Sequence, residues 1–297
     1  ISCVAIGYNA MNSTGGNAQT GTVAVGKNAL TSLTAGTGST AIGWDSGKSV
    51  TTGDYNTGYG YNTLGGNTGT ALTGDRNTVI GASAGRDMEG ATTNNVLVGD
   101  SAGILLTTGS YNTIVGTYAG DAMTTTNNCT LIGRAAGSGI NSTDANETVC
   151  VGNDSGEALT SAQHTTAIGY KALGGNSTGD NNTALGRQAL LTCTGENNTA
   201  IGEGAMVDLV EGNNNIAIGK AAMGGTMDTA ADASYGNIAI GKDAMGGAWD
   251  TATSNYNIAI GEQAMDDAMN GCSYNVAIGR RAATMIETGD SNIAIGA

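Results

Sequence analysis

The chain has 297 residues, with 50 Gly, no Pro, no Phe and a formal net charge of −14. Its 11 basic residues are too few for binding of nucleic acid, whose phosphates are met by Lys and Arg. No apolar run approaches the roughly 18 residues that a membrane span needs, so membrane insertion is not expected. The hydrophobic fraction of 39% comes mostly from Ala, Ile, Val and Met, which indicates a thin, regularly stacked structure.

A short motif that ends in glycine recurs along the whole chain. We number positions from this glycine, which is slot 0; the intervals between copies run from 16 to 22 residues. Self-similarity at this period predicts one tandem-repeat domain over residues 1–297, a segment of a longer array with about 17 coils. The motif glycines are Gly7, Gly26, Gly43, Gly60, Gly81, Gly99, Gly116, Gly133, Gly152, Gly169, Gly186, Gly202, Gly219, Gly241, Gly261, Gly279 and Gly296.

The residues before each glycine predict a short β-strand. Slot −3 is β-branched in every copy, slot −2 is usually Ala, and slot −1 is aliphatic, as in Ile201 and Ile218, in every copy except Tyr59. Such a run is typical of a strand that is buried on both faces. The glycine indicates a positive φ or a close approach of another chain. We therefore expect an all-β, elongated parallel β-solenoid (β-roll).

Slots +3 and +4 predict a second short strand. Slot +3 is mostly Ala, and slot +4 is Gly where slot −2 is large, as in Leu131 with Gly137. Where slot −2 is Ala, slot +4 is usually Leu or Met, as in Ala167 with Leu173. Because packed interiors tolerate neither voids nor excess volume, this exchange indicates that the two slots share one space.

Slot −4 is Asn in 11 copies, among them Asn77, Asn198 and Asn215. Two interpretations remain open. Stacked at about 4.8 Å per coil, these residues would form a ladder of side-chain amides along the solenoid. Alternatively, each Asn is a turn residue at the entry to its strand.

Little in the sequence indicates catalysis or a cofactor. The lone histidine, His164, has no nucleophile motif around it, and Asp266 and Asp267 are expected to belong to a solvated acidic surface. We expect no enzyme activity, no cofactor and no required metal, although calcium between coils remains an option. The five cysteines have no CxxC spacing and are expected to be free and mostly buried, which favours assembly in a reducing cytosol.

Two expanded intervals, Gly224–Gly236 and Gly246–Tyr256, carry aromatic residues. Because insertions in solenoids form loops, often on a binding face, Tyr235, Trp249 and Tyr256 are candidate contacts for a surface glycan. The alternative is that they cap local apolar surface. Trp44, directly after a motif glycine, is interpreted as structural.

One chain offers little core per coil. About four apolar side chains, each worth roughly 1.5–3 kcal/mol, stand against roughly 20–30 kcal/mol for ordering a coil of some 18 residues. Further burial between chains is therefore expected, and we predict a homo-oligomer, most plausibly a homotrimer.

The motifs also resemble known repeats. The segments Asn182–Gly186 and Asn275–Gly279 are similar to "NSVAIG" repeats in the heads of trimeric autotransporter adhesins, and Asn198–Met206 resembles the "NTAIGxxAL" repeats of phage and virus tail fibres. The resemblance implies a left-handed parallel β-roll with three chains per fibre. It also implies attachment to a host cell-surface glycan or protein, from a virion surface or an extracellular position.

The function predicted from the sequence is a non-enzymatic structural and adhesive fibre. Free cysteines and the longer motif favour a viral tail fibre, and a bacterial adhesin or extracellular filament is the alternative. An ice-binding solenoid would need an unbroken Thr array, whereas Val96 interrupts slot −3 and Ile replaces Thr from Ile216 onward. A polysaccharide depolymerase would need carboxylates clustered across coils.

Overall fold

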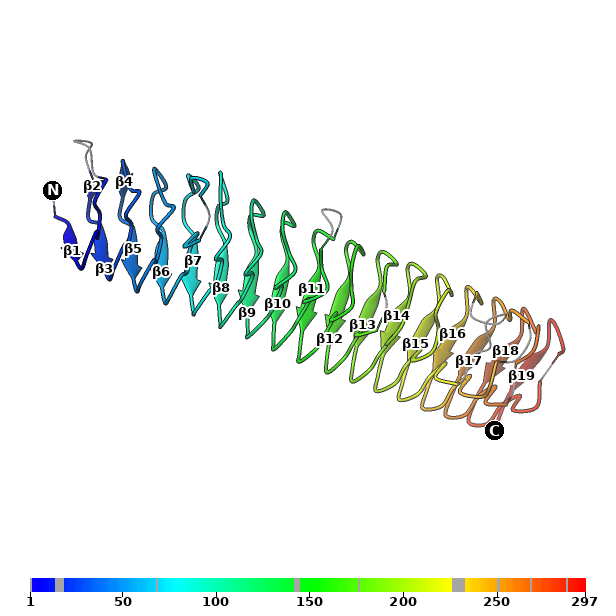
Figure 1. Ribbon diagram of the computed structural model, residues 1–297. Coiled ribbons are helices and arrows are strands. Elements are labelled where there is room, and N and C mark those ends of the chain that lie inside the picture. The colour runs from blue at the N-terminus through cyan, green and yellow to red at the C-terminus, as the bar shows by residue number, and fades with distance from the viewer. Residues whose placement is uncertain are drawn as a thin grey trace. The chain divides into compact units, whose positions relative to one another are not determined.

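The computed structural model describes residues 2–13, 19–67, 69–141, 145–175, 177–225, 233–249, 252–267, 269–286 and 288–297. These residues contain β-strands, turns and no helix. The chain divides into two compact units, Ile1–Thr148 and Val149–Ala297. Each unit is a parallel β-solenoid in which every coil contributes one strand beside that of the next coil (Figure 1). The predicted all-β solenoid class is therefore confirmed.

The motif strands are three residues long, and each ends directly before its motif glycine. The first unit holds β1 (Val4–Ile6), β3 (Val23–Val25), β5 (Thr40–Ile42), β6 (Thr57–Tyr59), β7 (Thr78–Ile80), β8 (Val96–Val98), β9 (Thr113–Val115) and β10 (Thr130–Ile132). It also holds a parallel pair, β2 (Gln19–Thr20) and β4 (Gly36–Thr37). The second unit holds β11 (Val149–Val151), β12 (Thr166–Ile168), β13 (Thr183–Leu185), β14 (Thr199–Ile201), β15 (Ile216–Ile218), β16 (Ile238–Ile240), β17 (Ile258–Ile260), β18 (Val276–Ile278) and β19 (Ile293–Ile295).

Neighbouring strands pair slot for slot. In β13 and β14, for example, Thr183 lies beside Thr199 and Ala184 beside Ala200. The register holds even where the interval is expanded, since Ile216 of β15 pairs with Ile238 of β16. Each slot therefore forms a column that runs along its unit, and a property of a slot is a property of a whole column.

The motif glycine has the predicted positive φ, and its backbone is closely approached by its own chain rather than by another chain. At Gly81, Gly116, Gly186, Gly202 and Gly219, φ lies between +137° and +143°. A Cβ at any of these positions would collide with the carbonyl oxygen of the next motif glycine. The close neighbour is the next coil of the same chain. Glycine is thus required by backbone conformation and by the spacing of the coils together.

The slot −4 asparagines form the amide ladder. The side-chain Oδ1 of Asn198 accepts a hydrogen bond of 2.9 Å from the backbone N–H of Asn215, and the Oδ1 of Asn215 accepts one of 3.0 Å from that of Asn237. In the first unit, the Oδ1 of Asn77 accepts a bond of 3.1 Å from the N–H of Asn95. All five asparagines are fully buried. The ladder interpretation is confirmed, because these amides bond from coil to coil inside the solenoid.

The strands are buried on one face only, so the prediction of burial on both faces is wrong. Slot −2 side chains such as Ala200 and Ala217 point inward and are completely buried. Slots −3 and −1 of the same strands are half-buried or exposed; Ile201 is half-buried and Ile218 is 36% exposed. Alternation along a strand sends these two slots to the outside. The sequence did not reveal this one-sided burial, because the outward slots lack the strongly polar side chains that usually alternate with buried ones.

Slots +3 and +4 form turns, so the predicted second strand is wrong. The cause is backbone conformation: Leu173 at slot +4 has a φ of 47°, and Lys171 at slot +2 has a φ of 53°, neither compatible with an extended strand. The shared space, in contrast, is confirmed. A Cβ at Gly137 would lie 2.8 Å from Leu131 Cδ2, a side chain of its own coil.

Candidate functional site

The outer face of each sheet carries two apolar columns. Slot −3 contributes Thr, Val or Ile, and slot −1 contributes Ile, Val or Leu, with Tyr59 as the exception. Exposed aliphatic members include Ile80, Val96, Ile132, Leu185, Ile218, Ile260 and Ile278. Because the coils are in register, these side chains form continuous stripes along each unit, and contiguous exposed apolar surface of this kind marks an interaction site.

Aromatic side chains are concentrated on the outside. All ten tyrosines are exposed, as is Trp44, whereas Trp249 is fully buried. The Trp249 Nε1–H donates a hydrogen bond of 3.1 Å to the backbone oxygen of Met245, so the indole belongs to the interior. The prediction of Trp249 as a glycan contact is therefore wrong.

Tyr235 and Tyr256, the other two predicted contacts, lie together on the surface. Their ring centroids are 4.9 Å apart in an edge-to-face arrangement, and Tyr256 stacks on Tyr274 with centroids 5.3 Å apart. A hydrogen bond to Tyr235 is the main cause that raises the pKa of Tyr256. The sequence analysis missed Tyr274, which occupies slot −5 as Tyr256 does, and the shared slot was the signal. Parts of the two expanded intervals, residues 226–232 and 250–251, lie outside the described residues.

Trp44 forms a second aromatic group in the first unit. It is 50% exposed, so it lies at the surface and not in the interior. Its ring makes an edge-to-face contact with Tyr61 at a centroid distance of 5.5 Å, and the Lys27 ammonium lies 4.9 Å from the centroid. All three residues occupy slot +1 of successive coils, a column that the sequence analysis did not follow.

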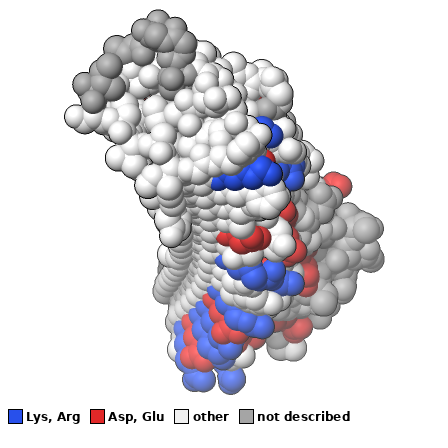
Figure 2. Space-filling view, turned by 60° about the vertical axis from the view of Figure 1, so that its left-hand side comes forward, with Lys and Arg blue, Asp and Glu red and all other residues white. Residues whose placement is uncertain are grey.

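In the second unit most of the slot +1 column is charged, and its acidic residues lie between basic ones. Glu203 lies 3.3 Å from Arg187 and 3.4 Å from Lys220, and Glu262 lies 3.3 Å from Arg280. Figure 2 shows basic and acidic side chains alternating in this way on the face it presents. Exposed pairs contribute about 0–1 kcal/mol each, so this column indicates a solvent-facing edge rather than a source of stability.

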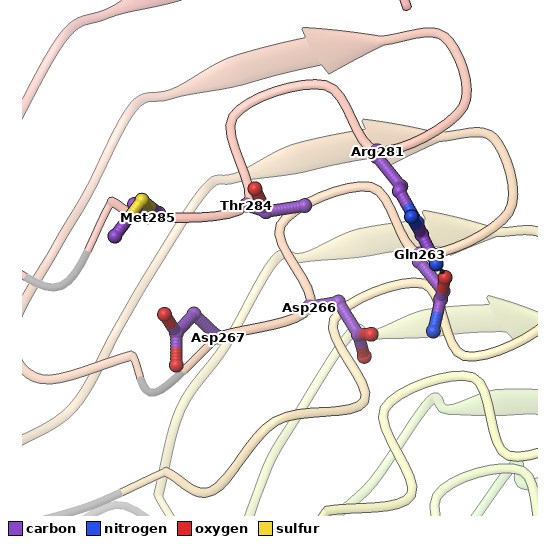
Figure 3. A pocket seen from close by; sticks show the side chains of 6 residues that line it. All are labelled: Gln263, Asp266, Asp267, Arg281, Thr284 and Met285. Carbon is purple, nitrogen blue, oxygen red and sulfur yellow. Dashed lines mark hydrogen bonds between the residues drawn. The ribbon is translucent and has the colours of Figure 1, made fainter.

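A shallow hollow near the last coils holds the paired carboxylates (Figure 3). Asp266 and Asp267 line it with Gln263, Arg281, Thr284 and Met285, and the Arg281 Nε donates a hydrogen bond of 2.9 Å to Gln263 Oε1. Burial, then the charge of Asp243, raises the pKa of Asp266. Asp267 is exposed, as expected of an acidic surface.

Other reactive groups are dispersed. His164 is exposed in a turn. The five cysteines are free; Cys129, Cys150, Cys193 and Cys272 are buried and Cys3 is half-buried, which confirms the prediction. Within the described ranges, no group of three His, Cys, Asp or Glu side chains is placed to hold a metal ion. The same ranges contain no helix that is long and apolar enough to cross a membrane.

Comparison with known protein families finds no match for this chain, and comparison with curated proteins finds no significant relative. The similarity to tail-fibre and adhesin repeats therefore rests on the motif alone. What the fold itself defines is a class: a tandem-repeat parallel β-solenoid with an apolar outer sheet face and exposed aromatic groups at its corners.

Proposed function

We propose that this chain is a non-enzymatic subunit of a homotrimeric fibre, most plausibly a viral tail fibre that attaches to a host surface. The observation that carries the proposal is the pair of apolar columns at slots −3 and −1. A β-branched and an aliphatic side chain point outward from nearly every coil. Soluble monomers rarely expose continuous apolar surface of this kind.

Three copies can cover these columns by packing their sheet faces around a common axis. Slot +1, beside each face, holds mostly charged or polar residues, as in the usual arrangement of an apolar interface core with a polar rim. A closed, cyclic arrangement also prevents further lateral association, which suits a fibre of fixed width. Thr at slot −3 adds half-buried hydroxyls to the face without making it strongly polar.

The assembly is tested by the mass of the native protein in solution. Light scattering after size-exclusion chromatography should give three times the mass of one chain. The mass of a monomer at micromolar concentration would contradict the proposed trimer. The mass of a dimer would also contradict it and would indicate a two-chain assembly instead.

The biological context is tested separately. Gold-labelled antibodies raised against this chain should decorate appendages of virus particles in negatively stained samples of the source material. Labelling of cell-surface appendages instead would favour the alternative, a bacterial adhesin or extracellular filament.

A further inference from the structure

The slot +1 position that Trp44 occupies does not require an aromatic residue. At the equivalent slot +1 position, nine of the other coils carry a charged side chain: Lys27, Asp100, Arg134, Arg187, Glu203, Lys220, Lys242, Glu262 and Arg280. The coil therefore closes without an aromatic residue there. Trp44 and Tyr61 are nevertheless 50% and 52% exposed, which places two large rings in water at neighbouring coils.

The two rings are held in fixed positions. The backbone N–H of Asn62 donates a 2.8 Å hydrogen bond to the carbonyl oxygen of Trp44, and the N–H of Asp45 donates one of 2.9 Å to that of Lys27. These bonds fix the slot +1 column from coil to coil. The contact between the rings of Trp44 and Tyr61 then orients the indole. The platform is thus preorganised, which lowers the entropy cost of binding.

Polar groups accompany the rings. Lys27, Trp44 and Tyr61 are each followed by Asn or Asp, and Asn28 Nδ2 donates a 2.7 Å hydrogen bond to Asp45 Oδ1. The Lys27 side chain is exposed and its ammonium lies over the Trp44 ring, so it can move aside or donate to a ligand. Flat rings beside amide, carboxylate and ammonium groups combine a stacking surface with hydrogen-bond partners.

We propose that Trp44 and Tyr61 form a binding platform for the pyranose rings of a polysaccharide. The face of an aromatic ring is electron-rich and attracts the weakly positive C–H groups on one face of a pyranose, while the hydroxyls bond to neighbouring polar side chains. Stacking of nucleic-acid bases is disfavoured by the net charge of −14. The charged members of the slot +1 column indicate that this edge remains in solvent when the sheet face is covered. The inference deepens the proposed attachment function.

The test is calorimetric titration of the 297-residue chain with two probes, the neutral cellohexaose and the carboxylated hexagalacturonate. We expect saturable binding of at least one probe, weakened at least tenfold by Trp44→Ala and less by Trp44→Phe. Tyr61→Ala should also weaken it. The matched control is Tyr170→Ala, which removes an exposed tyrosine from the same slot in the second unit and should leave the affinity unchanged.

Binding of neither probe by the parent chain overturns the inference, as does binding that Trp44→Ala leaves intact. Circular dichroism verifies that each variant folds, which is expected because Trp44 is exposed. Tryptophan fluorescence of the parent chain provides a second readout. A saccharide bound at Trp44 should shift the emission maximum of this exposed indole and leave that of the buried Trp249 unchanged. Light scattering on the same samples separates the two proposals. A trimer that binds neither saccharide contradicts only the proposed binding platform. A monomer that binds a saccharide contradicts only the proposed trimer.

Discussion

Asn198 shows how one side chain connects neighbouring coils. Its Oδ1 accepts hydrogen bonds from the backbone N–H and the Nδ2 of Asn215, and its Nδ2 donates one of 2.7 Å to the backbone oxygen of Gly212. All of these groups are buried, where an unpaired donor or acceptor costs about 1–3 kcal/mol. The column of such residues satisfies backbone groups that the short strands leave open.

Replacing Asn198 by Ala should lower the free energy of unfolding by about 2–4 kcal/mol, because the N–H of Asn215 and the oxygen of Gly212 both lose their partner. The control is Asn213→Ala. Asn213 Oδ1 accepts a 2.7 Å bond from the N–H of Glu196 at an exposed site, where water replaces it. Urea denaturation measures the free energy of unfolding of both variants. Equal losses of stability would show that burial of the ladder does not matter.

A pair of glycines in one coil separates backbone strain from coil spacing. Gly202→Ala should destabilise strongly, because its Cβ would collide with the carbonyl oxygen of Gly219. Gly204→Ala meets no neighbour and adopts a φ of +64°, a conformation that other slot +2 residues such as Lys171 also have, so it should cost about 1 kcal/mol. Thermal unfolding measures the contrast, and a similar fall in both melting temperatures would contradict the close approach.

Burial makes two thiols resistant to ionisation. It raises the pKa of Cys129 and of Cys193 from 9.0 to about 11. The unfolded chain therefore loses these protons first, so the stability contributed is complete below pH 9 and is lost as the pH rises towards 11. The melting temperature should fall more between pH 8 and 10.5 in the parent than in a Cys129→Ala, Cys193→Ala double variant. Equal falls would show that these thiols are not involved.

At the scale of the coil, the exchange of volume between slots −2 and +4 can be tested by a double-mutant cycle. Leu173→Gly should cost about 2–4 kcal/mol, the loss of a buried Leu partly offset by relief of its positive φ. Adding Ala167→Leu reproduces the native pair of Leu131 and Gly137 and should restore part of the loss. If the second change restores none of it, the two slots do not share space. Guanidinium denaturation supplies the four free energies.

Most features of the coil can be predicted from the repeat alone. Period, strand position, the need for glycine and the shared core space all followed from residue types in fixed slots. Turn conformation did not follow, because Leu and Met at a φ near 50° contradict their usual preference and only tertiary packing imposes it. A second ladder at slot −6 was also missed: Asp54 Oδ1 accepts a 2.7 Å bond from the N–H of Thr37, and mixed Asp, Asn and Ser residues concealed the pattern.

The candidate sites were harder to predict than the fold, because they depend on whether a side chain points into the solenoid or towards solvent. Trp44 and Trp249 are the same residue type, yet one is half in solvent and the other fully buried. The motif spacing places Trp44 at a corner, whereas Trp249 lies in an expanded interval, at a position that pairs with Met269 of the next coil. Apolar columns on the outside were invisible for a related reason, because an outward Ile and an inward Ile look alike in a sequence.

At the scale of the whole molecule, the decisive question is what covers the outer sheet face. Ile218→Glu with Ile260→Glu places two carboxylates in the slot −1 column, where each side chain is 36% exposed in the single chain. Water can solvate these carboxylates in a monomer, so the coils should still fold, whereas an interface between chains would bury them at a cost of several kcal/mol per ion. The double variant should therefore elute as folded monomers while the parent elutes as trimers. Lys220→Glu, on the same coil but at the slot +1 rim, should keep the parent mass. A double variant that retains the trimer mass would show that the chains assemble through another surface.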